Sequence, residues 1–349
     1  MPQRNRSSLE TDPASEEFIA RAQRYRPELL AYCYRMLGSL VDAEDAVQEI
    51  YLRAWRSYGA FEARASERTW LYRIATNTCL TALAHHSRRV LPSGLDGPSD
   101  DPSQPPNSAD ATVRWLQPLP DARLDVEDND PASIVSGRDS VRLALIASLQ
   151  YLPPRQRAVL ILREVLAWSA AEVAALLDMS VAAVKSALQR ARARLDQVMP
   201  SADHPAQLTE PEQRALLENY IAAFEAADPA ALERLLRHDA TLEAPPLRTW
   251  YAGIRTCLPY MATHVMGSPR HWRMFPTQAN GQPAVAAYTR SLDGRYVPYG
   301  IVVLTAGTDG ISAITAFGEP GLVTAFGFPA TLPEGPDQLD VLKAQSQQI

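Results

Sequence analysis

The stretch from residue 168 to 195, WSAAEVAALLDMSVAAVKSALQRARARL, most constrains what this chain can fold into. It predicts a short apolar-striped helix, a break at Asp178-Met179-Ser180, and a second helix with Ser180 as its N-cap. Two helices joined by such a turn, the second one basic, are typical of the helix-turn-helix, whose second helix lies in the DNA major groove. An amphipathic helical hairpin with a solvated basic face is the alternative.

The second helix of this pair separates apolar from polar residues. Its apolar residues repeat at helical spacing and are expected to pack the helix against its own module: Val181, Val184, Leu188, Ala191 and Leu195. Polar and basic residues fall largely outside that stripe: Lys185, Ser186, Gln189, Arg190 and Arg192. These side chains are the candidates for contacts with phosphates and base edges.

The composition is that of an ordinary globular protein, with 46% hydrophobic and 21% charged residues and a net charge of −6. There is no apolar run of about 18 residues, so no membrane span is expected, and the polar N-terminus does not resemble a signal peptide. The three scattered cysteines have neither metal-binding nor redox spacing. We therefore expect a cytoplasmic protein without a metal site or cofactor.

A proline-rich acidic segment divides the chain. Between residues 95 and 139 there are ten acidic residues against three arginines, with seven prolines among them. Such a composition cannot bury enough apolar surface to fold alone, although Trp115 and Leu116 within it offer apolar groups that could dock on a partner. We expect a helical module at 14–92, a linker at 93–132, a second helical module at 133–199 and a third module at 207–332.

The first module contains two helices of different character. Residues 40–58 form an amphipathic pattern with acids at the start and arginines near the end, an order that the helix dipole alone explains. The next helix, from about Glu67 to Arg89, interleaves aromatic residues with arginines. That combination suits single-stranded DNA, because bases stack on rings while arginines follow phosphates. Trp70 and Tyr72 are also plausible core residues.

Taken together, three stretches resemble the extracytoplasmic-function (ECF) group of bacterial sigma factors, most closely its sigma-G-like actinobacterial type. They are DAEDAVQEIYLRAW (42–55), FEARASERTWLYRIATNTCL (61–80) and the run from 149 to 195, separated by the acidic linker. The resemblance covers roughly residues 18–199. It implies a transcription initiation factor without enzymatic activity, whose partners are RNA polymerase core and promoter DNA.

The resemblance also implies roles for individual residues. One surface of the 40–58 helix would bind the β′ clamp helices of the polymerase: Asp45, Gln48, Glu49, Leu52 and Arg53. The segment from 61 to 77 would capture and melt the −10 promoter element: Arg68, Trp70, Tyr72, Arg73 and Asn77. The helix-turn-helix would read the −35 element, with its supporting helix on the β flap: Val181, Ala182, Lys185, Ser186, Gln189, Arg190 and Arg192. The linker would thread toward the active-site cleft of the polymerase.

The third module changes from helical to strand-like periodicity. A capped helix starts at Thr209, a second helix runs from Asp228-Pro229 to about His238, and three β-rich runs follow, with hairpin turns at Asp293-Gly294 and Asp309-Gly310. Helices followed by an antiparallel sheet predict an α+β cone. The module resembles SnoaL-like members of the nuclear-transport-factor-two (NTF2) superfamily. The predicted fold is therefore two all-α sigma domains followed by a SnoaL/NTF2-like cone.

In that superfamily the sheet curls around a pocket. The candidate pocket residues here are Asp239, Trp250, His264, Trp272, Tyr288, Tyr299 and Phe317. A catalytic site would need Asp239 and His264 to converge. Binding of a small-molecule ligand is a second possible role of the domain. The resemblance implies a third role, in which the domain regulates the sigma core by contact, in place of a separate anti-sigma factor. A helix-turn-helix regulator with a ligand-binding C-terminal domain is the competing reading of the whole chain, and a SnoaL-type enzyme with an added DNA-binding module is the third.

Overall fold

Three helices form the N-terminal module in the computed structural model, which describes residues 21–58, 66–84, 87–124, 141–198 and 208–332. After a short turn η1 (Gln23–Tyr25) come α2 (Arg26–Leu37), α3 (Leu40–Ser57) and α4 (Glu67–Ala84). Gly38, with φ of 69°, ends α2, and Ser39 Oγ accepts the Asp42 N–H at 3.1 Å to begin α3. The predicted 40–58 helix is confirmed, whereas the next helix ends at Ala84, before the predicted Arg89.

The helix-turn-helix module has its break and the start of its second helix where the sequence predicts them. It comprises α6 (Leu143–Leu149), α7 (Pro154–Leu160), the π-helical turn η5 (Ile161–Val165), α8 (Ala170–Leu177) and α9 (Val181–Val198). Ser169 and Glu172 form a capping box on α8, and Asp178 ends that helix with φ of 53°. Ser180 Oγ then accepts the Ala183 N–H at 3.1 Å, which confirms Ser180 as the N-cap of α9.

The C-terminal domain is an α+β cone. Its helices are α10 (Glu210–Ala226), α11 (Pro229–Glu233), α12 (Ile254–Tyr260), the π-helical turn η6 (Met261–Val265) and α13 (Pro320–Ala325). Its strands are β1 (Leu236–Glu243), β2 (Trp250–Ala252), β3 (Trp272–Ala279), β4 (Gln282–Arg290), β5 (Tyr296–Gly307) and β6 (Gly310–Phe317). They form one sheet in the order β2-β1-β6-β5-β4-β3. Both predicted hairpin turns, β4–β5 and β5–β6, are confirmed.

Two details of this domain differ from the expectation. The sheet is mixed, because β1 pairs with β6 in parallel while the other pairs are antiparallel. Helix α11 ends at Glu233 instead of near His238, because the chain enters the sheet at Leu236, which pairs with Ile311. Pairing with a strand 75 positions away leaves no local signal, so periodicity alone extended the helix too far.

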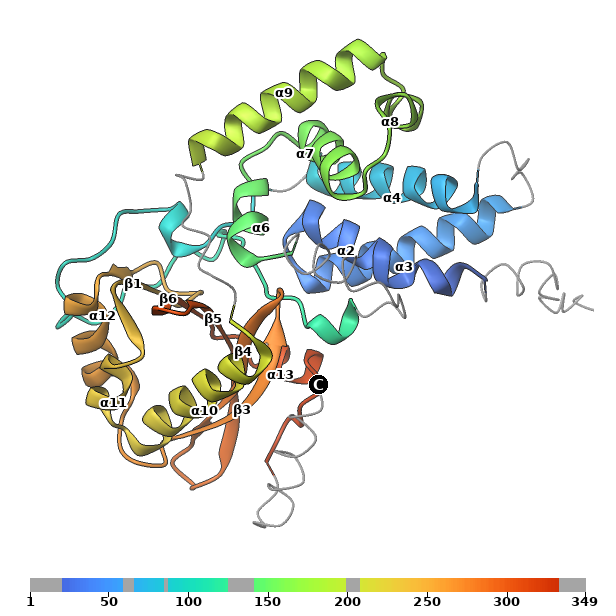
Figure 1. Ribbon diagram of the computed structural model, residues 1–349. Coiled ribbons are helices and arrows are strands. Elements are labelled where there is room, and N and C mark those ends of the chain that lie inside the picture. The colour runs from blue at the N-terminus through green and yellow to red at the C-terminus, as the bar shows by residue number, and fades with distance from the viewer. Residues whose placement is uncertain (1–20, 59–65, 85–86, 125–140, 199–207, 333–349) are drawn as a thin grey trace, which may run out of the picture.

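Each face of the sheet is buried against different elements. Val285, Ala287 and Val302 share one cluster with residues of α10, α11 and α12, the helices that lie beside the sheet in Figure 1. Ala284, Ala286 and their neighbours on the other side join a core cluster that also includes α13 and both helical modules. One face of the sheet therefore packs on the domain's own helices, and the other packs against the rest of the chain.

The linker lies along the C-terminal domain. Residues 87–124 include the short turns η3 (Pro92–Gly94) and η4 (Asp121–Arg123) and make isolated bridges with the domain at Ser99–Tyr251, Ser108–Leu247 and Pro120–Ala279. The Ser99 N–H donates to the Trp250 carbonyl at 2.8 Å, which extends the sheet beyond its edge strand β2. A segment that cannot form a core of its own is thus held in place by backbone pairing with its neighbour.

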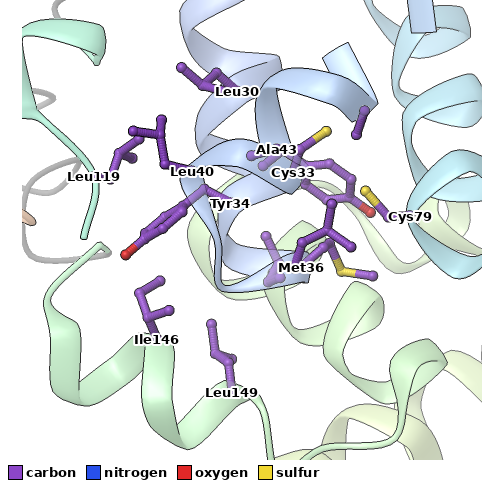
Figure 2. Close-up of a cluster of buried hydrophobic side chains, with 14 of the residues drawn as sticks. Leu30, Cys33, Tyr34, Met36, Leu40, Ala43, Cys79, Leu119, Ile146 and Leu149 are labelled. Atoms are coloured by element: carbon purple, nitrogen blue, oxygen red, sulfur yellow. The ribbon is translucent and has the colours of Figure 1, made fainter. Parts of the chain in front are cut away.

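One apolar cluster joins the linker to both helical modules. Figure 2 shows Tyr34 of α2 between Leu119 of the linker and Ile146 and Leu149 of α6. All four side chains have 1% or less of their surface exposed. The N-terminal module, the linker and the helix-turn-helix module therefore share a continuous core in this arrangement.

Candidate nucleic-acid and polymerase interface

Helix α9 presents its predicted DNA-reading residues to solvent. The apolar side chains at Val184, Leu188 and Ala191 are buried, as the stripe predicts. Val181, which was also expected to pack, is instead 41% exposed because it lies in the first turn of the helix, and Leu195 is only partly buried. The seven candidate residues are all exposed: Val181, Ala182, Lys185, Ser186, Gln189, Arg190 and Arg192. A surface depression of about 430 Å³ runs along this helix between Lys185 and Asp196. The burial pattern thus separates a packing side from an open basic side, as a groove-reading helix requires.

Helix α3 exposes an apolar and polar surface opposite its core stripe. Asp45, Gln48 and Leu52 are exposed, and Glu49 accepts a hydrogen bond from Arg53 Nε at 2.6 Å in an i,i+4 ion pair. Val41 and Trp55, which are 50% and 39% exposed, were not among the residues predicted for this surface. Both lie off the buried stripe, and that position is the signal that could have identified them. Large apolar groups exposed among charges are typical of a protein-binding surface.

Helix α4 offers only part of its predicted DNA surface. Arg73 and Asn77 are exposed and Trp70 is half-buried beside Tyr58. Arg68 is paired with Glu28 of α2 through three hydrogen bonds of 2.7–3.1 Å. Tyr72 has no exposed surface, because its ring packs edge-on against Tyr32 and Trp168.

The expectation that Tyr72 contacts a base is therefore wrong for this arrangement, because its ring belongs to the core. Burial raises the pKa of its phenol far above the ordinary value, and its hydroxyl donates to Glu28 at 3.2 Å. On a helix that also carries arginines, nothing in the local sequence separates a buried aromatic ring from an exposed one.

The helix-turn-helix module packs directly on α4. Arg73 donates from Nη2 to the carbonyl of Ala175 in α8 at 3.1 Å, and α7 and α8 lie beside α4 in Figure 1. The predicted −10 surface of one module is therefore covered in part by the predicted −35 module.

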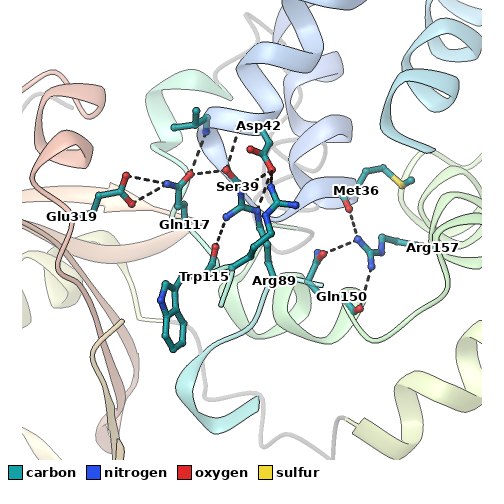
Figure 3. A network of polar contacts seen from close by, with 11 residues as sticks. Met36, Ser39, Asp42, Arg89, Trp115, Gln117, Gln150, Arg157 and Glu319 are labelled. Atoms are coloured by element: carbon teal, nitrogen blue, oxygen red, sulfur yellow. Dashed lines mark hydrogen bonds and ion pairs between the residues drawn. The ribbon is translucent and has the colours of Figure 1, made fainter. Parts of the chain in front are cut away.

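A buried arginine fixes the same interface. Arg157 of α7 is 2% exposed and donates to the carbonyls of Met36 and Gln150 and to the Gln150 side chain (Figure 3). It also donates to the carbonyl of Leu152 at 3.2 Å. Burial without a carboxylate partner lowers its pKa to about 10. Met36 lies in the last turn of α2, where the helix dipole favours a cation. This guanidinium thus binds to the C-terminal end of a helix from the other module.

The N-terminus of α3 is engaged by the linker. Asp42 accepts hydrogen bonds from Arg89 and Arg114, each at 2.7 Å, and Ser39 donates to Gln117 Oε1 at 2.7 Å. Gln117 Nε2 donates in turn to Glu319 of the C-terminal domain at 2.9 Å, as Figure 3 shows. A polar network therefore connects the candidate polymerase-binding helix, the linker and the cone.

The turn between β3 and β4 contacts three parts of the chain through one side chain. Asn280, fully buried with φ of 59°, accepts the Leu119 N–H on Oδ1 at 2.9 Å. Its Nδ2 donates to Tyr34 Oη at 2.7 Å and to the Val141 carbonyl at 2.6 Å. The neighbouring Gly281 N–H donates to Asp121 of the linker at 2.9 Å. The cone is thus attached to both helical modules and the linker at one point.

The candidate pocket residues do not gather in one site. Trp272, Tyr299 and Phe317 lie in the sheet, but Tyr288 and Phe317 belong to the outer cluster, and the Tyr288 hydroxyl donates to Pro329. The other three candidates have partners at the surface. Asp239 pairs with Arg237 at 2.8 Å, Trp250 Nε1 donates to the Asp96 carbonyl at 2.8 Å, and His264 lies 3.2 Å from the Ser103 carbonyl. The pairing of Asp239 and His264 that catalysis would need is therefore not present among these contacts.

The described residues contain no group of three or more His, Cys, Asp or Glu side chains arranged to hold a metal ion. Among the helices in the described ranges, none is long and apolar enough to cross a membrane.

Comparison with known proteins agrees with this geometry. Residues 22–89 match the family model for sigma-70 region 2, and residues 142–195 match the model for sigma-70 region 4. The chain is 48% identical over 326 residues to the ECF RNA polymerase sigma factor SigG of Mycobacterium tuberculosis, covering 92% of this chain and 87% of that protein. It is 29% identical over 178 residues to the RNA polymerase sigma-H factor of Pseudomonas aeruginosa, covering 50% of this chain and 82% of that protein.

A solved structure extends the likeness to the whole fold. The crystal structure of the Mycobacterium tuberculosis extracytoplasmic function sigma factor SigJ aligns with a TM-score of 0.57 and 22% identity, covering 89% of this chain and 99% of that one. The arrangement of two helical modules followed by a sheet-containing domain is therefore shared, and the fold class expected from the sequence is confirmed. The extent and identity of the match to SigG show that this chain belongs to the ECF family of RNA polymerase sigma factors.

Proposed function

We propose that α9 reads the −35 promoter element while α4 and α3 act on the −10 element and on the polymerase. The observation that carries this assignment is the exposure of all seven candidate side chains on α9 above a buried apolar stripe. Lys185, Arg190 and Arg192 supply phosphate contacts, and Ser186 and Gln189 supply hydrogen bonds to base edges. Val181 and Ala182 at the start of the helix offer apolar contacts to thymine methyl groups.

The polymerase-binding role belongs to the exposed side of α3. Asp45, Gln48, Glu49, Leu52 and Arg53 form the polar part of this surface. Val41 and Trp55 add apolar area on the same helix. Such a mixture of apolar anchors and surrounding charges suits a helix-on-helix contact with the β′ clamp.

The −10 role of α4 belongs to Trp70, Arg73 and Asn77, with Arg68 after release from Glu28. The −10 and −35 elements lie about 85 Å apart, because about 25 base pairs separate them at about 3.4 Å each. Arg73 of α4 and Ala175 of α8 are 3.1 Å apart here. A factor in this arrangement cannot contact both elements, so the two modules must separate before both promoter elements are bound.

The C-terminal domain modulates that separation. Its Asn280 and Glu319 contact the linker, and Asn280 also contacts Tyr34 and Val141 in the two helical modules. These contacts favour the closed arrangement over an open one, as an anti-sigma factor would. The domain acts as a binding module and catalyses no reaction, and the factor works in the cytoplasm with RNA polymerase.

Run-off transcription with purified core polymerase tests the assignment. The full chain is compared with a truncation after residue 199 and with a Lys185→Ala, Gln189→Ala double variant, on a library of promoters. We expect the double variant to lose selection at the −35 element while it still co-purifies with core polymerase. A full chain that gives no promoter-dependent transcript and does not bind core would favour the helix-turn-helix regulator instead. An unchanged output from the truncation would contradict modulation by the cone.

A further inference from the structure

We propose that Trp168 of the helix-turn-helix module occupies, in this closed arrangement, the place that an unstacked base of the −10 strand takes on α4. The inference rests on the proposed −10 role of α4 and identifies the side chain that competes with the DNA. Trp168 directly precedes Ser169, the N-cap of α8, and its indole is only 7% exposed. The indole and the base would therefore exclude each other from one site.

The site itself belongs to the N-terminal module. Glu28 of α2 accepts hydrogen bonds from Arg68 at 2.7–3.1 Å and from the Tyr72 hydroxyl at 3.2 Å. Arg68 Cζ lies 5.1 Å from the centroid of the Tyr72 ring, and Tyr32 packs edge-on behind that ring with centroids 5.3 Å apart. A guanidinium and an aromatic ring are thus fixed side by side on α4 before any DNA binds.

The indole of Trp168 makes the contacts that this pair of groups offers to a base. Its ring meets the Tyr72 ring edge-on with centroids 5.2 Å apart, and Arg68 Cζ lies 5.8 Å from its centroid. Aromatic rings and arginines are the groups on which proteins hold unstacked bases. An indole is a flat bicyclic ring of about the size of a purine. In the closed arrangement Tyr72 therefore reaches no base, because a ring of similar shape already covers it.

The indole is nevertheless an imperfect occupant. Its Nε1–H is buried and has no hydrogen-bond partner among the described residues. Such a donor loses its bond to water without replacement, so part of the gain from packing is cancelled. An occupant held in this way protects the site and can still be displaced. Binding of a base and separation of the modules would then favour each other reciprocally.

The experiment measures binding of a single-stranded deoxyadenylate dodecamer, labelled at one end, to the full-length chain by fluorescence anisotropy. Trp168→Leu keeps an apolar side chain for packing in its own module but removes the ring. The closed arrangement then loses one aromatic pair and one cation–π contact, so a larger fraction of the chain offers the site. We expect tighter binding by about 5- to 50-fold. An abasic strand of the same length should show no gain, because it presents phosphates without bases.

Trp115→Leu is the matched control, because it makes the same replacement in the linker. Figure 3 shows the Trp115 indole directed away from Asp42 and Arg89, whose bonds hold the linker on α3. This variant is expected to bind the strand like the parent.

A second set of variants separates competition for a base site from mere covering of α4. Combined with Trp168→Leu, Tyr72→Leu should abolish most of the gain, whereas Tyr72→Phe should retain it because the ring remains. Arg68→Gln makes the same comparison without altering the core, since the Arg68 side chain is 39% exposed. Co-purification of each variant with core polymerase reports whether its N-terminal module is folded.

The outcomes distinguish this inference from the proposed function. Promoter-dependent transcription by the parent holoenzyme, together with no gain in Trp168→Leu, would overturn the inference and leave the proposed function intact. An equal gain on the abasic strand, an equal gain in Trp115→Leu, or a gain that survives both Tyr72→Leu and Arg68→Gln would also overturn it. A parent chain that supports no transcription with core polymerase would instead count against the proposed function.

Discussion

Replacing Asn280 by alanine should detach the cone from the helical modules. The substitution removes three side-chain hydrogen bonds, to Leu119, Tyr34 and Val141. At about 1 kcal/mol for each bond this amounts to about 3 kcal/mol. Alanine at a φ of 59° adds about 1 kcal/mol of backbone strain. The docked arrangement should therefore lose about 4 kcal/mol relative to the undocked one, which is an equilibrium change of about 700-fold at 1.4 kcal/mol for each factor of ten.

Native-state hydrogen exchange measures this change at amides that the substitution leaves in place. The Gly281 N–H donates to Asp121 and the Leu143 N–H donates to Gln282, both across the same contact. Their protection factors should fall by up to about 700-fold in Asn280→Ala, and by about 150-fold in Asn280→Gly, because glycine tolerates the positive φ. Amides in the centre of β4 should keep their protection, since the cone itself stays folded.

Asn219→Ala is the matched control, because Asn219 is exposed on α10 of the same domain. It should leave both amides as protected as in the parent. If Asn280→Ala folds and both amides keep their parental protection, this side chain does not attach the cone. If glycine and alanine give equal losses, backbone strain at position 280 contributes nothing to the docked arrangement.

Three further perturbations test other contacts. Arg157→Ala should destabilise the interface of the two helical modules by at least about 3 kcal/mol, because several carbonyls lose a charged donor. Urea unfolding measures this loss of stability, and a loss below about 1 kcal/mol would contradict the prediction. Burial raises the pKa of Glu243, so the folded chain binds this proton more tightly than the unfolded chain, whose glutamates titrate near about 4.3. The protonated carboxyl therefore adds stability at pH values below about 4.3, and this stability is lost as the pH rises through the raised pKa of the folded state. Glu243→Gln should accordingly unfold at a higher temperature than the parent at pH 7.5 and at the same temperature at pH 4. A difference between the two proteins that does not change with pH would refute the assignment. Lys185→Ala should reduce by about 1 the slope of log affinity against log salt for holoenzyme on promoter DNA, and an unchanged slope would exclude a phosphate contact.

Local chemistry determined what could be predicted from the sequence. The caps at Ser180 and Thr209, the apolar stripe of α9 and the turns at Asp293 and Asp309 act within a few residues, so the sequence pattern contains them. The exposed side of α9 follows from the same stripe, so the exposure of the candidate DNA-contacting residues could be predicted, except at Val181, which the stripe placed on the packing side.

Contacts between modules have no such local signature. Asn280 lies 246 residues from Tyr34, and Arg157 lies 121 residues from Met36. Nothing in the neighbourhood of either residue distinguishes it from an ordinary turn asparagine or a surface arginine. The parallel pairing of β1 with β6 was missed, and the choice between core and DNA contact for Tyr72 was left open, because both depend on partners that come from distant segments.

Arg157 has a consequence for the response of the factor to ionic strength. Its guanidinium is buried and bonded to carbonyl and amide oxygens, and the amide of Asn280 bonds to uncharged groups. Mobile ions screen exposed charges strongly and buried dipolar contacts weakly. Added salt should therefore weaken promoter binding steeply while it leaves the contact between the two helical modules nearly unchanged. Salt titration can thus separate the energetics of opening the factor from the energetics of binding DNA.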